Sequence, residues 1–210
     1  MAECHGVWVD RLQKLGWGRM FVVRKGVPSP YPNEKWGFDN GAYRDWVRGE
    51  PFNEKAYWKS LNKILKVGVP QMAVLPDIVA AGQQSLDFSY SWLDRLPHHF
   101  PWYLAVQDGM KATDIDVTPL SGIFLGGTNR YKATAADWVK FAHENQLKFH
   151  YGRCGTRNKL AHALHIGADS LDSALPLFSR ARFRTFKEDV VNGPQQTDLF
   201  WQGEQNDAKK

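Results

Sequence analysis

Short apolar segments recur along the 210-residue chain, and stretches with helical periodicity separate them. Most of the segments are apolar without alternation, as expected for parallel strands that are covered on both faces. The candidate strands are Met20–Val23, Trp36–Asp39, Met72–Leu75, Tyr103–Val106, Ile123–Leu125, Lys148–Tyr151, Ser170–Asp172 and Phe183–Phe186. Strands that alternate with helices predict a parallel sheet.

Three of the intervening stretches place apolar residues at helical spacing. They contain Tyr57, Leu61, Ile64 and Leu65; Ala135, Trp138, Val139 and Ala142; and Thr156, Leu160, Ala163 and Leu164. Gly68 and Gly167 follow at positions where glycine commonly ends a helix. Eight candidate strands in this length predict a (β/α)8 TIM-type barrel of near-minimal size, with residues 1–191 as one catalytic domain. An open doubly wound sheet is the alternative, because periodicity does not reveal closure.

Composition narrows the class of protein. The N-terminus has no signal-peptide pattern and no apolar run is long enough for a membrane helix, so we expect a soluble, cytoplasmic protein. Two cysteines, Cys4 and Cys154, are too few for a four-ligand zinc site or a disulfide framework. The net charge of +5 favours polyanionic partners. Residues 192–210 form a polar, partly disordered tail, in which residues 199–201 are expected to dock on the body.

Polar residues and glycines follow most of the candidate strands. The segments are Asp39–Tyr43, Asp77, Gln107–Gly109, Gly126–Thr128, Gly152–Arg153 and Asp172–Ser173. In a parallel barrel these strand ends meet at one face, where active sites lie. A single Asp after a strand more often caps a helix, but several carboxylates facing one cavity repel each other and persist mainly where they perform chemistry. The sequence therefore predicts an active site of carboxylates and amides at this face.

Other polar residues have simpler interpretations. Asp169 is expected to cap or orient its strand end. His162 and His165 fit a helix surface rather than a metal site. The Gly126–Thr128 segment is too short to be a phosphate-binding glycine loop of a nucleotide site, so we expect neither a metal nor a cofactor.

Five segments resemble, in order, motifs of the tRNA-guanine transglycosylase superfamily, and most closely its DpdA-like DNA 7-deazaguanine transglycosylases of phages. FDNGAY at 38–43 is similar to the family's Asp-Ser-Gly-Gly-Phe segment, and PD at 76–77 to the strand-end Asp that reads guanine. VQDG at 106–109 resembles its Val-Gln-Gly-Gly segment, and GIFLGG at 122–127 the glycine segment that follows. GADSLDS at 167–173 resembles the region of the nucleophile. The resemblance spans about residues 36–175 and implies a barrel that exchanges guanine for another base.

The resemblance also implies residue roles. Asp172 would attack C1′ of a guanosine nucleotide, and Asp39 would act as the acid and base. Base-binding roles are implied for Asp77, Gln107, Gly126, Gly127, Asn40, Phe38 and Tyr151, with Tyr43 as a further candidate for stacking on the base. Phosphate contacts are expected from Arg153, Arg180 and Arg182.

Two departures from the family pattern affect the choice of substrate. The tRNA enzymes carry a cysteine-rich zinc-binding insertion after the nucleophile, whereas Cys154 precedes Asp172 and nothing after it can bind zinc. Asp108 replaces the first glycine of the Val-Gln-Gly-Gly segment. These differences favour DNA over tRNA as the partner, with a free 7-deazaguanine such as preQ0 as the second substrate.

Three other functions stay open. The same fold could hydrolyse the glycosidic bond of guanine, which would leave an abasic site. It could be a non-catalytic nucleic-acid-binding subunit of a transglycosylase, although the presence of both Asp39 and Asp172 argues against that. A barrel acting on sugar phosphates would usually show a glycine-rich phosphate site late in the chain, which residues 174–178 lack.

Overall fold

Seven parallel strands form one sheet, and each strand pairs with the next one along the chain. The computed structural model describes residues 7–23, 30 and 33–192. The strands are β1 (Arg19–Val22), β2 (Trp36–Asp39), β3 (Met72–Val74), β4 (Trp102–Val106), β5 (Gly122–Leu125), β6 (Lys148–Tyr151) and β7 (Ser170–Leu171). They agree with the first seven candidate strands to within one residue at every end, which confirms the parallel βα pattern.

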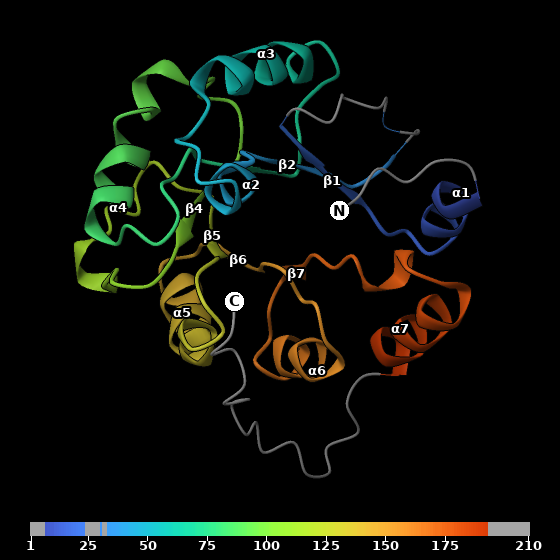
Figure 1. Ribbon diagram of the computed structural model, residues 1–210. Coiled ribbons are helices and arrows are strands. Elements are labelled where there is room, and N and C mark those ends of the chain that lie inside the picture. The colour runs from blue at the N-terminus through green and yellow to red at the C-terminus, as the bar shows by residue number, and fades with distance from the viewer. Residues whose placement is uncertain (1–6, 24–29, 31–32, 193–210) are drawn as a thin grey trace.

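The helices lie around the outside of the curled sheet (Figure 1). They are α1 (Val7–Lys14), α2 (Ala42–Val47), α3 (Glu54–Ile64), α4 (Gln83–Tyr90), α5 (Ala135–Glu144), α6 (Arg157–His165) and α7 (Arg180–Asn192). Short 3-10 turns join them: η1 (Leu93–Arg95), η2 (Ala112–Asp114), η3 (Tyr131–Thr134) and η4 (Leu175–Leu177). The result is a TIM-like α/β fold whose sheet forms a half-barrel, with β1 and β7 as its two edges.

The closed barrel is therefore not formed by the described residues, and the eighth candidate strand is wrong. Residues 183–186 lie inside α7. Phe183 and Phe186 are three residues apart, which is helical spacing, and they contact aromatic rings on one side of that helix. Phe183 lies 5.4 Å from Trp8 and Phe186 lies 5.5 Å from Trp17, measured between ring centroids. The two aromatic residues thus fasten α7 to α1 and to the segment before β1 instead of pairing in the sheet.

The helix predictions are confirmed with one exception. Tyr57, Leu61 and Ile64 of α3 are fully buried, but Leu65 follows the end of the helix and is 42% exposed. The predicted apolar residues of α5 are all buried, and Leu160 and Ala163 bury the inner face of α6. The Thr156 side chain accepts a hydrogen bond from the Lys159 N–H and begins α6. Asn192, the first residue of the predicted tail, is the last residue of α7, whereas residues 193–210 and Cys4 lie outside the described residues.

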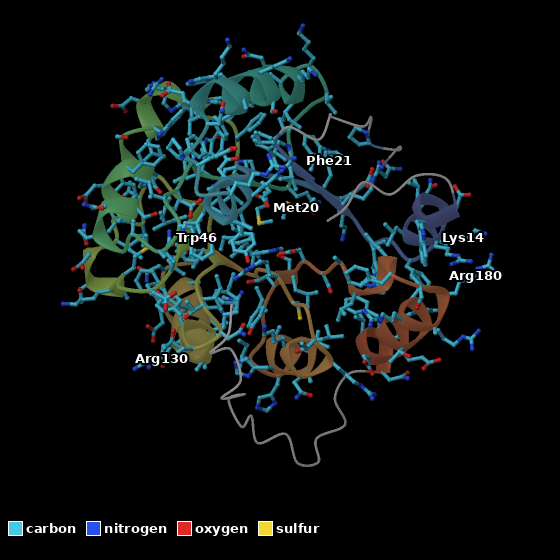
Figure 2. All side chains as sticks on the ribbon, in the orientation of Figure 1. Lys14, Met20, Phe21, Trp46, Arg130 and Arg180 are labelled. Atoms are coloured by element: carbon cyan, nitrogen blue, oxygen red, sulfur yellow. The ribbon has the colours of Figure 1, made fainter. Side chains whose placement is uncertain are left out.

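The sheet separates a large apolar core on its outer side from a small apolar cluster inside the curl. Neighbouring Met20 and Phe21 point to opposite sides of the sheet (Figure 2). Phe21 belongs to the large core between sheet and helices, whereas Met20 packs with Met72 and Tyr103 inside the curl. Among the described helices, every one is too short or too polar to cross a lipid bilayer.

Candidate active site

Asp172 lies directly after β7 and points its carboxylate at the end of β6. Its Oδ1 accepts a hydrogen bond from the Arg153 N–H (2.9 Å) and lies 3.2 Å from His150 Nε2. The Asp172 carbonyl oxygen accepts from the Cys154 N–H (2.8 Å), and the Ser173 hydroxyl donates to the Cys154 carbonyl (2.6 Å). The loop after β6 therefore holds both the main chain and the side chain of this residue.

His150 is a site residue that the sequence interpretation missed. Its ring is 3% exposed and stacks on Phe124 inside the curl, with the ring centroids 4.8 Å apart. Its Nδ1 lies 2.8 Å from the Ser170 hydroxyl, so a ring protonated at Nε2 can donate to Asp172 while Ser170 donates to Nδ1. Alternation along β6 and β7 places His150, Ser170 and Asp172 on the same face, and this was the signal that could have identified it.

The pKa of Asp172 is low although burial of its carboxylate acts to raise it. Burial raises this pKa, but the hydrogen bond and charge of His150 and the Arg153 N–H outweigh burial and lower it to about 2. A carboxylate that accepts such hydrogen bonds stays ionised at neutral pH. Asp172 is thus an anion available as a nucleophile.

The pKa of Asp39, at the end of β2, is shifted in the opposite direction, upward. Burial is the main cause that raises its pKa, and the negative charge of Asp172 raises it further. The Gly41 N–H donates to Asp39 Oδ1 (2.9 Å) and the charge of His150 opposes the rise, without cancelling it. The two carboxylates lie close enough to repel each other, and their surroundings separate their pKa values, as in paired acid and nucleophile sites.

A buried network of amides surrounds Asp77, which follows β3. Asn40 Nδ2 donates to Asp77 Oδ1 (2.7 Å) and to the Leu75 carbonyl (2.5 Å). Gln107 Nε2 donates to Asp77 Oδ2 (3.0 Å) and to the Ser85 hydroxyl (2.7 Å), and Gln107 Oε1 accepts from the Ala80 N–H. Asn40 and Gln107 therefore position Asp77 instead of presenting free amides. Each carboxylate oxygen has two lone pairs, so Asp77 retains the capacity to accept further hydrogen bonds.

The pH dependence of stability should report the burial of Asp77. Burial is the largest cause that raises its pKa, to about 7 against an ordinary 3.8, with the charge of Asp39 adding to the rise. Because the folded-state pKa is the higher one, this group's stabilising contribution is complete below about pH 4 and is lost as the pH rises through 7. We expect the free energy of unfolding to fall by up to ~1.4 kcal/mol per pH unit in this window. The Asp77→Asn variant should lack that slope in denaturant titrations; equal slopes in both proteins would contradict the burial of an ionisable Asp77.

The glycines after β5 belong to a tight turn beside the site. The Gly126 N–H donates to the Val106 carbonyl (2.9 Å), so this donor is used within the protein, and its expected contact with a base oxygen stays a prediction. Gly127 has a φ of +73°, and a Cβ there would lie 2.8 Å from Asp108 Oδ2. Asp108 accepts from the Thr128 N–H (2.8 Å) and hydroxyl (2.7 Å), which fixes this turn. Asp108 thus has a structural role in this turn.

Arg153 forms the rim of the site. Its side chain donates to the Gly127 carbonyl (2.8 Å) and its guanidinium lies 4.1 Å from the centroid of the Tyr43 ring. Tyr43 is 44% exposed, whereas the other two stacking candidates, Phe38 and Tyr151, are each 1% exposed. Phe38 packs on Tyr57 of α3, because the residue before an inward-facing Asp39 must face the helices. Among the three candidates, only Tyr43 has an exposed ring.

Two expected phosphate contacts lie elsewhere. Arg180 is at the outer edge of the molecule, on the opposite side of the view from Trp46 of α2 (Figure 2). Arg182 lies over Phe178, 5.3 Å from its ring centroid. Asp169 has the predicted strand-end role, since it accepts from the Phe149 N–H (2.8 Å) and from Lys148 Nζ (3.0 Å). In the described part of the chain, none of these three residues hydrogen-bonds to Asp39, Asp77 or Asp172.

A cavity of about 720 Å³ lies inside the curl at the open side of the sheet. Its lining includes Met20 and Tyr103, and it reaches His150, Ser170 and Asp172. The part of the chain that the structure describes contains no group of three or more His, Cys, Asp or Glu placed to hold a metal ion.

A scan against models of known protein families finds no match. A search of curated proteins likewise finds no relative.

Proposed function

We propose that this protein is a nucleic-acid guanine transglycosylase that exchanges guanine in DNA for a 7-deazaguanine base. The observation that supports this most is the pair of strand-end carboxylates. Asp172 is held as an anion, and Asp39 beside it has a raised pKa. Exchange of a base at C1′ with retention needs two displacements, and therefore one nucleophilic carboxylate and one acid and base.

In the first displacement an Asp172 oxygen attacks C1′, and the bond between C1′ and guanine N9 breaks. Asp39 gives its proton to the departing base. In the second, the incoming base attacks C1′ through N9, its N9 proton passes to Asp39, and the bond to Asp172 breaks. His150 and the Arg153 N–H occupy Oδ1 of Asp172, which leaves Oδ2 as the attacking atom.

Recognition of guanine needs an acceptor for N1–H and the exocyclic amine. Asp77 fills this role, held by Asn40 and Gln107. Tyr43 stacks on the base, and Arg153 contacts the adjacent phosphate. A duplex must release the target nucleotide from the stack before it enters the site, at a cost of a few kcal/mol. The described sheet is a half-barrel with β1 and β7 at its edges. In this proposal the site lies at the carboxyl ends of the strands of this unclosed, TIM-like sheet.

Base exchange tests the proposal directly. A guanine-labelled DNA oligonucleotide and a labelled tRNA are each incubated with the protein, with and without preQ0. We expect no more than about one equivalent of label per enzyme to leave DNA without preQ0, because release then stops at the covalent intermediate, and release of many equivalents when preQ0 is present. Asp137→Asn, which changes an exposed carboxylate on α5, is the matched control and should exchange like the wild type.

The other outcomes are equally informative. Release of label without preQ0, together with an abasic site, would replace the transferase by a hydrolase. Release from tRNA alone would reverse the choice of nucleic acid. Binding of DNA without release from either substrate would contradict the catalytic proposal and indicate a binding subunit.

A further inference from the structure

Lys132 is a buried cation that takes no part in the proposed chemistry. It lies in η3, between β5 and α5, and is 2% exposed. Lysine is rarely buried so completely without a partner for its charge, because removing an ammonium from water is costly. Its contacts must therefore compensate for that cost.

Both hydrogen bonds of the ammonium group go to backbone carbonyls at neighbouring strand ends. Nζ donates to the carbonyl of Leu125, the last residue of β5, at 3.1 Å, and to the carbonyl of Gly152, which follows β6. It also lies 4.8 Å from the centroid of the Tyr151 ring. The Leu125 carbonyl accepts the Gly152 N–H as well (3.1 Å), so Lys132 adds a contact across the end of this strand pair.

The Gly152 carbonyl belongs to the same peptide group as the Arg153 N–H. That N–H donates to Asp172 Oδ1 at 2.9 Å. A peptide group is planar, and its C=O and N–H point in opposite directions, so a cation bound to the oxygen at one end orients and polarises the N–H at the other. Lys132 and Asp172 are thus connected through one peptide group.

The peptide group between Gly152 and Arg153 needs a stabilising contact, because the backbone of Arg153 has an unfavourable conformation. Arg153 has a φ of +51°, in the left-handed region that side-chain-bearing residues rarely adopt. The preceding residue, Gly152, has no room for a side chain, because a Cβ there would lie 2.5 Å from the Phe124 ring and 2.7 Å from the Leu125 carbonyl oxygen. A contact that fixes the Gly152 carbonyl therefore fixes the direction of the Arg153 N–H.

We propose that Lys132 is a positioning residue for Asp172, which orients and strengthens the Arg153 N–H hydrogen bond by binding the Gly152 carbonyl from the other side. The importance of this contact for base exchange rests on the proposed function, whereas the contact itself does not. Lys132 does not touch the reacting atoms.

The charge state of Lys132 is sensitive to pH. Burial is the main cause that lowers its pKa, to about 7. The charges of Arg153 and Lys159 lower it further, whereas Asp172 and Cys154 raise it. An ammonium polarises the peptide group more strongly than a neutral amine does, so the Arg153 hydrogen bond should weaken as the pH rises through neutrality.

The test follows the Arg153 amide resonance by NMR between about pH 5.5 and 8.5. This range spans the pKa of Lys132, which burial lowers to about 7. In the wild type we expect it to titrate near neutral pH, moving upfield as the pH rises. The titration should be lost in Lys132→Met and kept in Lys159→Met. Lys159 is the matched control, because its charge acts on Lys132 but its Nζ donates to Asn129 Oδ1 (2.6 Å) and not to the peptide group.

The wild-type titration needs no variant, so a failure of Lys132→Met to fold would not remove the test. An Arg153 amide that does not move with pH, or that titrates equally in Lys132→Met, would overturn the proposal. If base exchange is present, Lys132→Met should lower its kcat about tenfold at unchanged KM, the size expected for weakening one charge-assisted hydrogen bond. Absence of exchange in the wild type with a normal Arg153 titration would refute the proposed function and leave the role of Lys132 intact.

Discussion

Replacing Asp172 with asparagine is expected to lower the rate of base exchange by about a thousandfold or more, as for loss of a catalytic nucleophile or its partner. An amide oxygen cannot form the glycosyl ester, although it can still accept from His150 and from the Arg153 N–H. Single-turnover release of labelled guanine from DNA measures the effect. DNA affinity should stay near the wild-type value, which separates loss of chemistry from loss of binding.

The same substitution has a thermodynamic signature. Because the pKa of Asp172 is lowered to about 2 in the folded protein, this carboxylate stabilises the fold above about pH 4, and that contribution is lost as the pH falls through 2. Asp172→Asn should therefore melt at a lower temperature than the wild type at neutral pH. Full exchange activity in a folded Asp172→Asn protein would place the nucleophile elsewhere.

Replacing Asp39 with asparagine should slow guanine release by about a hundredfold to ten-thousandfold, the usual effect of losing a general acid. The protonated form of Asp39 is the acid, and burial raises its pKa, so the wild-type rate should fall as the pH rises through that pKa. The variant should lack this limb of the pH profile. Rapid-quench measurement of the first release step over pH gives both results.

A change of leaving group separates the two carboxylates further. N7-methylguanine departs as a neutral base without receiving a proton, so an acid is not required. Asp39→Asn should therefore regain most of the wild-type release rate on DNA that contains this base, whereas Asp172→Asn should not. Equal defects of Asp39→Asn on both bases would show that Asp39 does not supply the proton.

The strands were predictable because a parallel sheet covered on both faces produces compact apolar segments with polar ends. The strand-end argument also identified Asp39, Asp77 and Asp172 together, since parallel strands bring their carboxyl ends to one edge. The eighth strand failed because Phe183 and Phe186 satisfy helical spacing as well as apolar content. Closure depends on contacts between the first and last strands, which a local pattern does not contain.

The site residues that lie differently from the expected arrangement do so for a common physical reason. Phe38 and Tyr151 were expected to face a base, but strand alternation turns them toward the helices once Asp39 faces inward. Gly126, Gln107 and Asn40 carry suitable polar groups, yet those groups are used within the protein. His150 and Lys132 were missed because their importance comes from partners about 20 residues away, Asp172 and Gly152 respectively. Such pairings depend on register and three-dimensional contact.

The covalent intermediate is the most direct measure of whether Asp172 is the nucleophile of a double displacement. The protein is mixed with a guanine-containing DNA oligonucleotide without an incoming base, denatured rapidly and analysed by intact mass and peptide mapping. We predict an adduct of the oligonucleotide minus guanine on the peptide that carries Asp172, lost on addition of preQ0 and absent from Asp172→Asn. An adduct on another residue, or exchange that proceeds without any adduct, would contradict the mechanism.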